Sequence, residues 1–389
     1  MVTNNEQNKL NVPHLRFPEF HGEWEKHGLS EYLDFKNGLN PDSKRFGKGI
    51  KFISVMDILN NPVITYDCIR ASVQATDAEI SSFSVEKGDI LFQRSSETLE
   101  DVGRANVYID DRVAVFGGFV IRGKKKANYN PLFFRYLLSS PYARKRIIPM
   151  GAGAQHFNIG QEGLSKVLLN FPSIEEQTKI ASLLHLLDER IATQSKLIED
   201  LKKLKSAISK KLLCNDKWTT CIIQDIAEIG RGRVISSVEI DRQKHLLYPV
   251  YSSQTSNNGI MGYLDNYMFD GEYITWTTDG ANAGTVFYRK GKFNCTNVCG
   301  TLKILPKFDC YFVSLVLQQA TQKYVSSNLA NPKLMNNTMA SIKIRMPNIE
   351  TQKQLSKVFQ TLDSCLLVHQ RTCKMYLSEK QYLLRQMFI

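Results

Sequence analysis

The sequence lacks a continuous apolar run of about 20 residues, the length that a membrane-spanning helix requires. The polar start, Met1 to Lys9, also lacks the apolar centre of a secretory signal peptide. We therefore expect no membrane span and a cytoplasmic protein.

The sequence also lacks paired cysteines. Its eight cysteines are irregularly spaced, none forms a C-x-x-C pair, and only Cys295 and Cys299 lie close together. This spacing favours reduced thiols over a disulfide framework or a zinc site. We expect no metal in this chain.

Three catalytic motifs are missing. The sequence has no Pro-Pro pair, which the base-binding loop of an adenine methyltransferase needs. Its lone Pro-Asp pair, Pro41-Asp42, is preceded by Asp34-Phe-Lys36, which is the reverse of the order in a Pro-Asp…Asp/Glu-x-Lys nuclease core. Gly118 to Lys124 has the glycine and lysine spacing of a phosphate-binding loop, but Lys125 replaces the Ser or Thr that would hold magnesium. We read this stretch as a strand followed by a basic turn, and we predict no catalytic residue and no cofactor in this chain.

The bulk composition permits two folded domains. With 389 residues and 43% hydrophobic residues, the chain can bury cores of ordinary size. Its net charge of +12 suggests a polyanionic partner, although the charge is spread evenly and forms no basic tail.

What the sequence does contain is a duplication. The stretch from Phe171 to Leu213 realigns without a gap onto Met346 to Phe388, at a constant offset of 175 residues. Both copies begin with Pro-x-Ile-Glu-x-Gln, at Pro172 and at Pro347, and each follows a longer, poorly matching stretch. The chain therefore alternates a variable domain with a repeated spacer.

Each spacer has the pattern of a coiled-coil helix. At 4-3-4-3 spacing from Ile180 and from Leu355, eight of ten positions are apolar in each copy. The residues that we expect to pair the helices are Ile180, Leu184, Leu187, Ile191, Leu201, Leu355, Phe359, Leu362, Leu366 and Leu383. The polar interruptions recur at equivalent positions, Gln194 with His369 and Lys205 with Lys380, which predicts a role in register. Ser173 and Glu176 predict a capping box at the first helix start.

The expected fold class is α/β or α+β, with two globular domains held by two long antiparallel coiled-coil helices in a pseudo-two-fold duplication. The boundaries that we predict are 1–23 for a lead-in segment, 24–170 for the first variable domain, 171–217 for the first spacer, 218–345 for the second variable domain and 346–389 for the second spacer. We predict that helices from Pro131 to Arg146 and from Cys310 to Val325 close the two variable domains.

One alignment inside the variable domains predicts a binding loop. Lys87 to Ser95 matches Asp270 to Thr278, and each strand runs into a polar loop. Side chains of these types read base edges or grip phosphates. The loop candidates are Gln93, Arg94, Ser95 and Ser96 in the first domain and Thr277, Thr278 and Asn282 in the second. From positive charge we add Lys124, Lys125, Arg144, Arg231 and Arg233 as phosphate contacts.

The layout, the paired helix starts, Leu15 to Phe20 with Trp24, and Gly151 to Ile159 together resemble the specificity subunit of type I restriction-modification systems. The resemblance implies a bacterial protein that binds double-stranded DNA, each variable domain reading one half of a bipartite site, with helices that set the gap and dock two methyltransferase subunits. It further implies restriction and motor subunits as partners, and S-adenosylmethionine, ATP and magnesium on those partners. Gln155 and Asn158 become DNA-binding candidates, as does Lys333, although Asn331 to Leu334 departs from the first half.

Two alternatives remain open from the residues alone. One is a DNA-modifying enzyme with an unfamiliar centre, for which Asp279 beside Asn282 is the only sign. The other is a scaffold whose two domains bind proteins.

Overall fold

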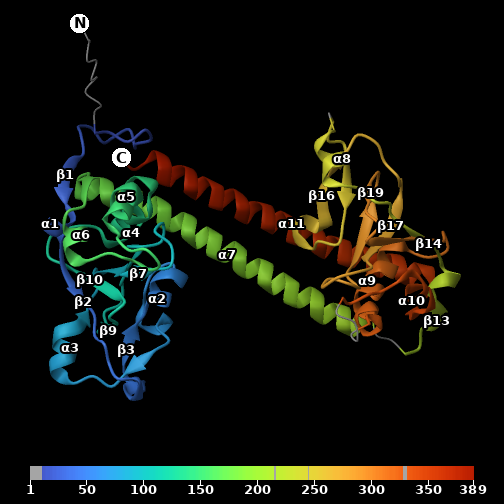
Figure 1. Ribbon diagram of the computed structural model, residues 1–389, viewed down its shortest axis with the longest axis horizontal. Helices are drawn as coiled ribbons and strands as arrows, with labels where there is room; N and C mark the ends of the chain where they lie inside the picture. Colours follow the sequence, from blue (N-terminus) through green and yellow to red (C-terminus); the bar gives the residue numbers. More distant parts are fainter. Residues whose placement is uncertain (1–10, 214–215, 244, 327–330) are drawn as a thin grey trace, which may run out of the picture. The chain divides into compact units, whose positions relative to one another are not determined.

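The computed structural model describes residues 11–213, 216–243, 245–326 and 331–389, and these divide into two compact units (Figure 1). The first unit runs to Ser195 and includes Gln370–Ile389, and the second is Lys196–His369. Each unit thus contains a variable domain together with part of both spacers. Cys214 lies outside the described residues, and the other seven cysteines are free thiols. No helix of the described chain is long and apolar enough to cross a membrane.

Short strands and helices alternate in the first variable domain. In chain order they are β1 (Glu25–Gly28), α1 (Leu29–Tyr32), β2 (Leu33–Asn37), η1 (Ser43–Arg45), β3 (Phe46–Ile53), α2 (Val55–Asn60), η2 (Tyr66–Cys68), β4 (Ser72–Val73), α3 (Asp77–Phe83), β5 (Ser84–Val85), β6 (Ile90–Gln93), β7 (Ser95–Ser96), β8 (Ala105–Val107), β9 (Ala114–Phe116), β10 (Val120–Lys125), α4 (Pro131–Ser139), α5 (Pro141–Ile147), η3 (Ile148–Met150), β11 (Phe157–Asn158), α6 (Gln161–Ser165) and β12 (Leu168–Phe171).

The long helix α7 (Ile174–Leu212) follows, and the second variable domain repeats the mixed pattern. Its elements are β13 (Thr219–Ile222), η4 (Ile223–Asp225), β14 (Ala227–Arg231), α8 (Ser237–Asp241), β15 (Tyr248–Tyr251), η5 (Ser256–Gly259), β16 (Ile260–Leu264), β17 (Glu272–Thr277), β18 (Val286–Lys290), β19 (Asn294–Cys295), β20 (Cys299–Ile304), α9 (Cys310–Ala320), η6 (Thr321–Tyr324), α10 (Asn336–Ser341) and β21 (Lys343–Met346), and α11 (Ile349–Gln386) ends the series.

The duplication extends into the variable domains, although their sequences diverge. Each is built around a four-stranded antiparallel sheet, in the order β2-β10-β6-β8 in the first and β14-β20-β17-β18 in the second. In both, the first strand ends at a glycine that leaves no room for a side chain. A Cβ on Gly38 would lie 2.1 Å from the Gly117 carbonyl oxygen, and one on Gly232 would lie 2.2 Å from that of Cys295. The α+β class and the internal duplication are therefore confirmed.

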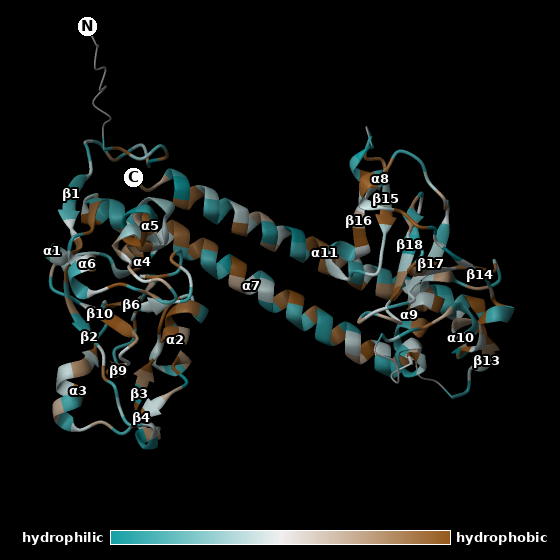
Figure 2. Cartoon of the chain, viewed as in Figure 1, coloured by the Kyte–Doolittle hydropathy of each residue, from teal (hydrophilic) through white to brown (hydrophobic). Residues whose placement is uncertain are grey.

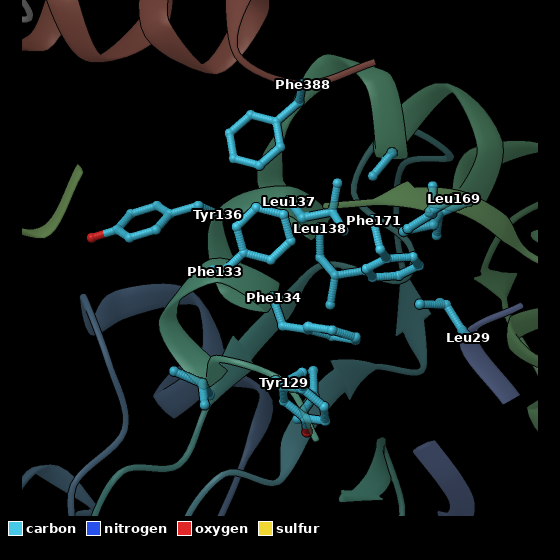
Figure 3. Close-up of a cluster of buried hydrophobic side chains, with 14 of the residues drawn as sticks. Leu29, Tyr129, Phe133, Phe134, Tyr136, Leu137, Leu138, Leu169, Phe171 and Phe388 are labelled. Carbon is cyan, nitrogen blue, oxygen red and sulfur yellow. The ribbon is translucent and has the colours of Figure 1, made fainter. Parts of the chain in front are cut away.

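A helix packs on each sheet, as the sequence predicted, but the first one is broken. Ser140 ends α4 and caps α5, because the residue before a proline disfavours helical geometry and Pro141 follows. The core in Figure 3 is rich in aromatic side chains from α4, and Phe388, just beyond α11, packs beside Phe133. The second unit is built alike, with Trp218 against Phe312 of α9 where the first has Trp24 against Phe133.

The two long helices pack together in each unit as a coiled-coil seam. All twenty positions of the 4-3-4-3 template are buried or half-buried, and Figure 2 shows hydrophobic and hydrophilic residues alternating along both helices. In the first unit, the start of α7 shares a core with the end of α11, through Ile180, Leu184 and Leu383. In the second unit, Ile208 of α7 shares a core with Phe359 of α11. The helices are therefore antiparallel within each unit, and the predicted pairing is confirmed.

The lysines of the seam form reciprocal ion pairs. Lys380 pairs with Asp188 in the first unit, and Lys205 pairs with Asp363 in the second. Each aspartate also accepts a hydrogen bond from a tyrosine of the adjoining domain helix, from Tyr136 at 2.8 Å and from Tyr311 at 2.5 Å. In each unit the lysine of one repeat thus pairs with the aspartate of the other repeat. This pattern supports the predicted register function of the two lysines.

The repeated Pro-x-Ile-Glu-x-Gln motif joins each helix to its domain. The side chain of Gln177 donates to the Pro172 carbonyl and accepts from the backbone N–H of Asn130, the residue that caps α4. The side chain of Gln352 makes the same two contacts with Pro347 and Asp309. Both glutamines are buried, where backbone N–H and C=O groups cannot bond to water. The glutamine side chains therefore supply the hydrogen bonds that these backbone groups need.

The predicted capping box at the start of α7 is half correct. The Ser173 hydroxyl accepts from the N–H of Glu176, but the Glu176 carboxylate is held by Arg16 at 2.7 and 2.8 Å. Trp24 donates to the same carboxylate at 3.4 Å. The lead-in segment is thereby tied to α7, and the Leu15 N–H bonds the Gln386 carbonyl at the end of α11.

We predict that Asp188→Asn lowers the free energy of unfolding by about 2 kcal/mol, because it leaves Lys380 and Arg135 without a partner carboxylate. Burial raises the pKa of Asp188, but Lys380, Arg135 and Tyr136 outweigh it and hold the pKa below the ordinary 3.8. The stabilisation is therefore present above pH 3.8 and is lost as the pH falls below that value. Urea melts between pH 3 and 7 measure this, with exposed Asp200→Asn on the same helix as the control. Equal losses in both variants would contradict the account.

Candidate nucleic-acid interface

The structure brings together residues that the sequence placed in two separate segments. The strand β7, directly after β6, pairs antiparallel with β11, so that Ser95 faces Asn158 and Ser96 faces Phe157. The Ser95 hydroxyl donates to the Asn158 side chain, and the Arg94 carbonyl accepts from the N–H of Ile159. The predicted loop and the segment before α7 thus form one surface.

Within this surface the side chains differ in exposure. Arg94 is half-buried, and its guanidinium donates to the Gly118 carbonyl at 3.2 Å. Gln93 is only 5% exposed and donates to the Ser95 carbonyl, so it supports the loop from beneath. A DNA contact stays a prediction for both residues, and Arg94 is the better placed.

Gln155 lies near the tip of a small hairpin. Ala152 and Asn158 exchange two backbone hydrogen bonds of 2.8 and 2.9 Å, and residues 153–156 between them are exposed. Gly153 at the turn has a φ of +145°, which glycine tolerates best. The hairpin extends the Arg94 surface, and DNA contacts of Gln155 and Asn158 stay predictions.

The second unit has an equivalent surface, but the sequence alignment was out of register by one residue. Gln93 exchanges backbone hydrogen bonds with residues 103 and 104, and Thr277 does so with residues 284 and 285. Thr277 therefore corresponds to Gln93 and Thr278 to Arg94. The alignment of Lys87–Ser95 with Asp270–Thr278 could not reveal this shift, because the register is fixed by the backbone hydrogen bonds between the strands.

At these equivalent positions the chemistry differs. Thr277 and Thr278 are buried, and Thr278 accepts from Arg231 at 3.0 Å and donates to Asp279 at 2.8 Å. Asp279 occupies the position of Ser95 and pairs with Arg231 at 3.2 Å and with Lys333 at 3.8 Å. Thr277 and Thr278 are therefore positioned to shape the loop.

The structure gives several predicted phosphate contacts other partners. The Arg144 guanidinium donates to the carbonyls of Glu100, Val102 and Gly103 at 2.6 to 2.9 Å, and burial lowers its pKa to about 10. Arg233 is paired with Glu239. These arginines hold loops in place, and whether they also contact DNA stays a prediction.

Lys124 and Lys125 lie at the opposite end of β10 from the Arg94 surface. Val120 pairs with Gln93, whereas Lys125 pairs with Leu33 at the other end of the strand. Lys124 is 3.4 Å from Glu86, and Lys125 donates to the Tyr129 carbonyl at 3.1 Å. The strand and basic turn that we predicted here are thus present, but the two lysines are not part of the Arg94 surface.

Two polar segments were not singled out from the sequence. Lys44 and Lys48 are exposed on either side of Phe46, in a loop that precedes and begins β3. In the second unit, residues 252–258 form a polar loop in which Asn257 and Asn258 have positive φ, and Asn282 donates to the Ser253 carbonyl at 3.2 Å. Positive φ in residues other than glycine often marks a functional loop. The signal available in the sequence was the polar run itself.

The described residues contain no group of three or more His, Cys, Asp or Glu side chains that could hold a metal ion. The surfaces described here are instead loops with mixed amide, hydroxyl and guanidinium groups, which suit recognition of bases and phosphates.

We predict that Arg144→Ala lowers the free energy of unfolding by about 2–3 kcal/mol, because three carbonyls lose a charged donor. Thermal melts of Arg144→Ala and of the control Lys145→Ala, an exposed neighbour, measure the difference. Unchanged stability would show that Arg144 acts chiefly on a partner rather than on its own loop.

The family model described as type I restriction modification DNA specificity domain matches the chain twice, over residues 21–203 and 215–374. A putative type I specificity subunit of Mycoplasma pneumoniae is 37% identical over 198 residues, covering 50% of this chain and 82% of that protein. The specificity subunit of the type I restriction enzyme MpnII from the same organism is 42% identical over 145 residues, covering 37% of this chain and 43% of that protein.

Solved structures show the same fold. The S subunit of a type I restriction-modification system from M. genitalium aligns with a TM-score of 0.70, at 17% identity, over 97% of this chain and 99% of that one. A chain from a study of assembly of the type I R-M system aligns with a TM-score of 0.53, at 12% identity, over 93% of this chain and 96% of that one. The resemblance inferred from the repeated motifs is confirmed, and the chain belongs to the family of type I restriction-modification DNA specificity proteins.

Proposed function

We propose that this chain is the specificity subunit of a type I restriction-modification complex and that each unit reads one half of a bipartite DNA target. The observation that carries this proposal is that the two units share the same backbone arrangement but have different side chains at corresponding positions. Arg94, Ser95 and Asn158 in the first unit correspond to Thr278, Asp279 and Lys333 in the second. Two such surfaces would select two different half-sites.

The first surface offers the groups that major-groove recognition uses. An arginine can bond guanine with two hydrogen bonds, and amide side chains such as Gln155 and Asn158 can bond adenine. The second surface presents Arg231 and Lys333 around Asp279, a mixture of donors and an acceptor. An acceptor carboxylate suits the amino group of cytosine.

Catalysis and its cofactors belong, in this proposal, to partner subunits. Two methyltransferase subunits would bring S-adenosylmethionine, and restriction and motor subunits would bring ATP and magnesium. Support comes from the family match to a DNA specificity domain and from the absence of catalytic motifs in the sequence. Purification of the chain together with a methyltransferase that then modifies DNA would test this directly.

The long helices provide a surface for such partners. Apolar side chains outside the seam remain exposed on both helices, and they are Leu186, Leu197, Leu204, Val358, Leu367, Val368, Met375, Leu377 and Tyr382. Beside Val358 an open, mainly apolar hollow of about 470 Å³ lies between Ile208 and Gln354. Exposed apolar surface of this kind marks protein interfaces, and we assign the hollow beside Val358, within the second unit, to a methyltransferase subunit.

We predict that Arg94→Ala relaxes the requirement for one base pair in one half-site and leaves the other half-site unchanged. A bidentate arginine–guanine contact is worth about 1–3 kcal/mol of discrimination. Binding of the assembled complex to duplexes that vary at each position measures this. Lys87→Ala is the control, because it removes the same charge from the opposite end of β6. Equal weakening on every sequence would make Arg94 a phosphate contact, and no change would remove it from the interface.

We propose further that the length of α7 helps set the unread gap between half-sites. Inserting four residues after Leu197 adds about 6 Å of helix, roughly two base pairs of duplex, with only about 40° of excess rotation. We predict a gap longer by one or two base pairs and unchanged half-sites, read by sequencing the methylated sites. The same insert after Asp111, in an exposed turn, is the control. An unchanged gap in an active complex would show that the helices are not the ruler.

A further inference from the structure

Two large apolar side chains are unusually exposed. Phe119 is 69% exposed and Val234 is 72% exposed, the highest values among the large apolar side chains of the described residues. Isolated exposed apolar residues are common and need no explanation. These two are different because both lie at the loop end of the four-stranded sheet of their unit, on two segments that neighbour each other there.

The equivalence follows from backbone contacts. The residue after the close-packed glycine forms a parallel bridge in both units, Leu39 with Gly117 and Arg233 with Thr296. Val234 follows Arg233 just as Asn40 follows Leu39. The Asn40 side chain lies directly against Gly118, since a Cβ on Gly118 would be 1.8 Å from it, so Asn40 neighbours the segment that carries Phe119. Val234 therefore corresponds to Asn40, and Phe119 corresponds to Val298. Phe119 and Val234 lie on the two neighbouring segments of the same end of the sheet, one after β9 and the other after β14.

This end of the sheet adjoins the recognition loop in each unit. The Arg94 N–H donates to the Phe119 carbonyl, and the corresponding Thr278 N–H donates to the Val298 carbonyl, both at 2.9 Å. The Arg94 guanidinium also bonds Gly118. In the first unit, then, Arg94 contacts the backbone of both Gly118 and Phe119, so Arg94 and Phe119 belong to one surface.

The surroundings of Phe119 combine apolar surface with positive charge. An open pocket of about 420 Å³ is lined by Phe119, Phe46, Met56 and Ser95. Lys44 and Lys48, on either side of Phe46, are exposed. This surface suits a polyanion that also exposes apolar groups. Duplex DNA is such a partner, because its major groove exposes the 5-methyl groups of thymine.

We propose that Phe119 and Val234 are specificity-determining residues that each contact the 5-methyl group of a thymine in the half-site of their own unit. The inference rests on the proposed function, since it takes the loops of Arg94 and Thr278 as the DNA-reading loops. It adds an apolar contact beside the polar ones, and it assigns that contact to the same end of the sheet in both units, supplied by a different segment in each.

The test measures binding of the complex assembled on the full chain to duplexes in which each thymine of the target is replaced in turn by uracil. For the wild type we expect about a fourfold loss at one thymine in each half-site, the factor for one buried methyl group. For Phe119→Ala we expect that loss to vanish in one half-site only, and for Val234→Ala in the other half-site only.

Matched controls are exposed valines elsewhere in the same units, Val113→Ala at the other end of β9 and Val238→Ala on α8. They should keep the wild-type uracil profile. Phe119→Leu should keep it as well, because leucine retains an apolar contact. Equal melting temperatures of all variants exclude an effect of folding.

The outcomes separate this inference from the proposed function. A wild-type complex that shows no preference for any duplex sequence would overturn the proposed function itself. Sequence preference without a sensitive thymine, or with a uracil profile that Phe119→Ala and Val234→Ala leave unchanged, would overturn the thymine contact alone.

Discussion

The rest of the structure depends on the antiparallel packing of α7 against α11 within each unit. The core of the first unit is incomplete without Leu383, Met387 and Phe388 from the end of the chain, and the core of the second includes Leu213 from the end of α7. Reciprocal ion pairs at Asp188 and Asp363 fix how the seam residues meet. Both spacers must therefore be in register before either globular unit can bury its apolar side chains, which explains why the spacers repeat closely while the domains do not.

The same constraint leaves the recognition surfaces free to vary. Each sheet is held from one side by its helix, through Gln177 or Gln352, and by the aromatic core around Trp24 or Trp218. The loops after β6 and β17 lie at one end of their sheets and carry little of that core. Substitutions there change hydrogen-bonding groups without emptying the core, so the two units can present a serine, Ser95, in one place and an aspartate, Asp279, in the equivalent place on the same backbone. Recognition is thus separated from folding in the way that loops on a rigid scaffold allow.

Much of this organisation could be predicted from the sequence, because repeats and apolar periodicity are local signals. The seam positions, the register lysines and the matching strands before the loops were all visible in that way. What the sequence could not show depended on contacts between distant segments. The strand register of Thr277 is fixed by its backbone hydrogen bonds with residues 284 and 285. The capping box at the start of α7 is half formed because Arg16 binds the Glu176 carboxylate. The Arg144 guanidinium is bound by carbonyls more than 40 residues away in the sequence. Phe119 and Val234 could not be matched at all, because they lie on different segments of the same end of the sheet.

The measurement that tests the central claim most directly is a genome-wide map of methylated bases made by long-read sequencing, with the chain produced together with the methyltransferase subunit that we propose as its partner. Our account predicts a single bipartite motif, with two different specified halves separated by a gap of fixed length and unspecified sequence. A continuous motif, or a motif with only one specified half, would contradict the claim that two equivalent scaffolds with different loop chemistry each read their own part of the target.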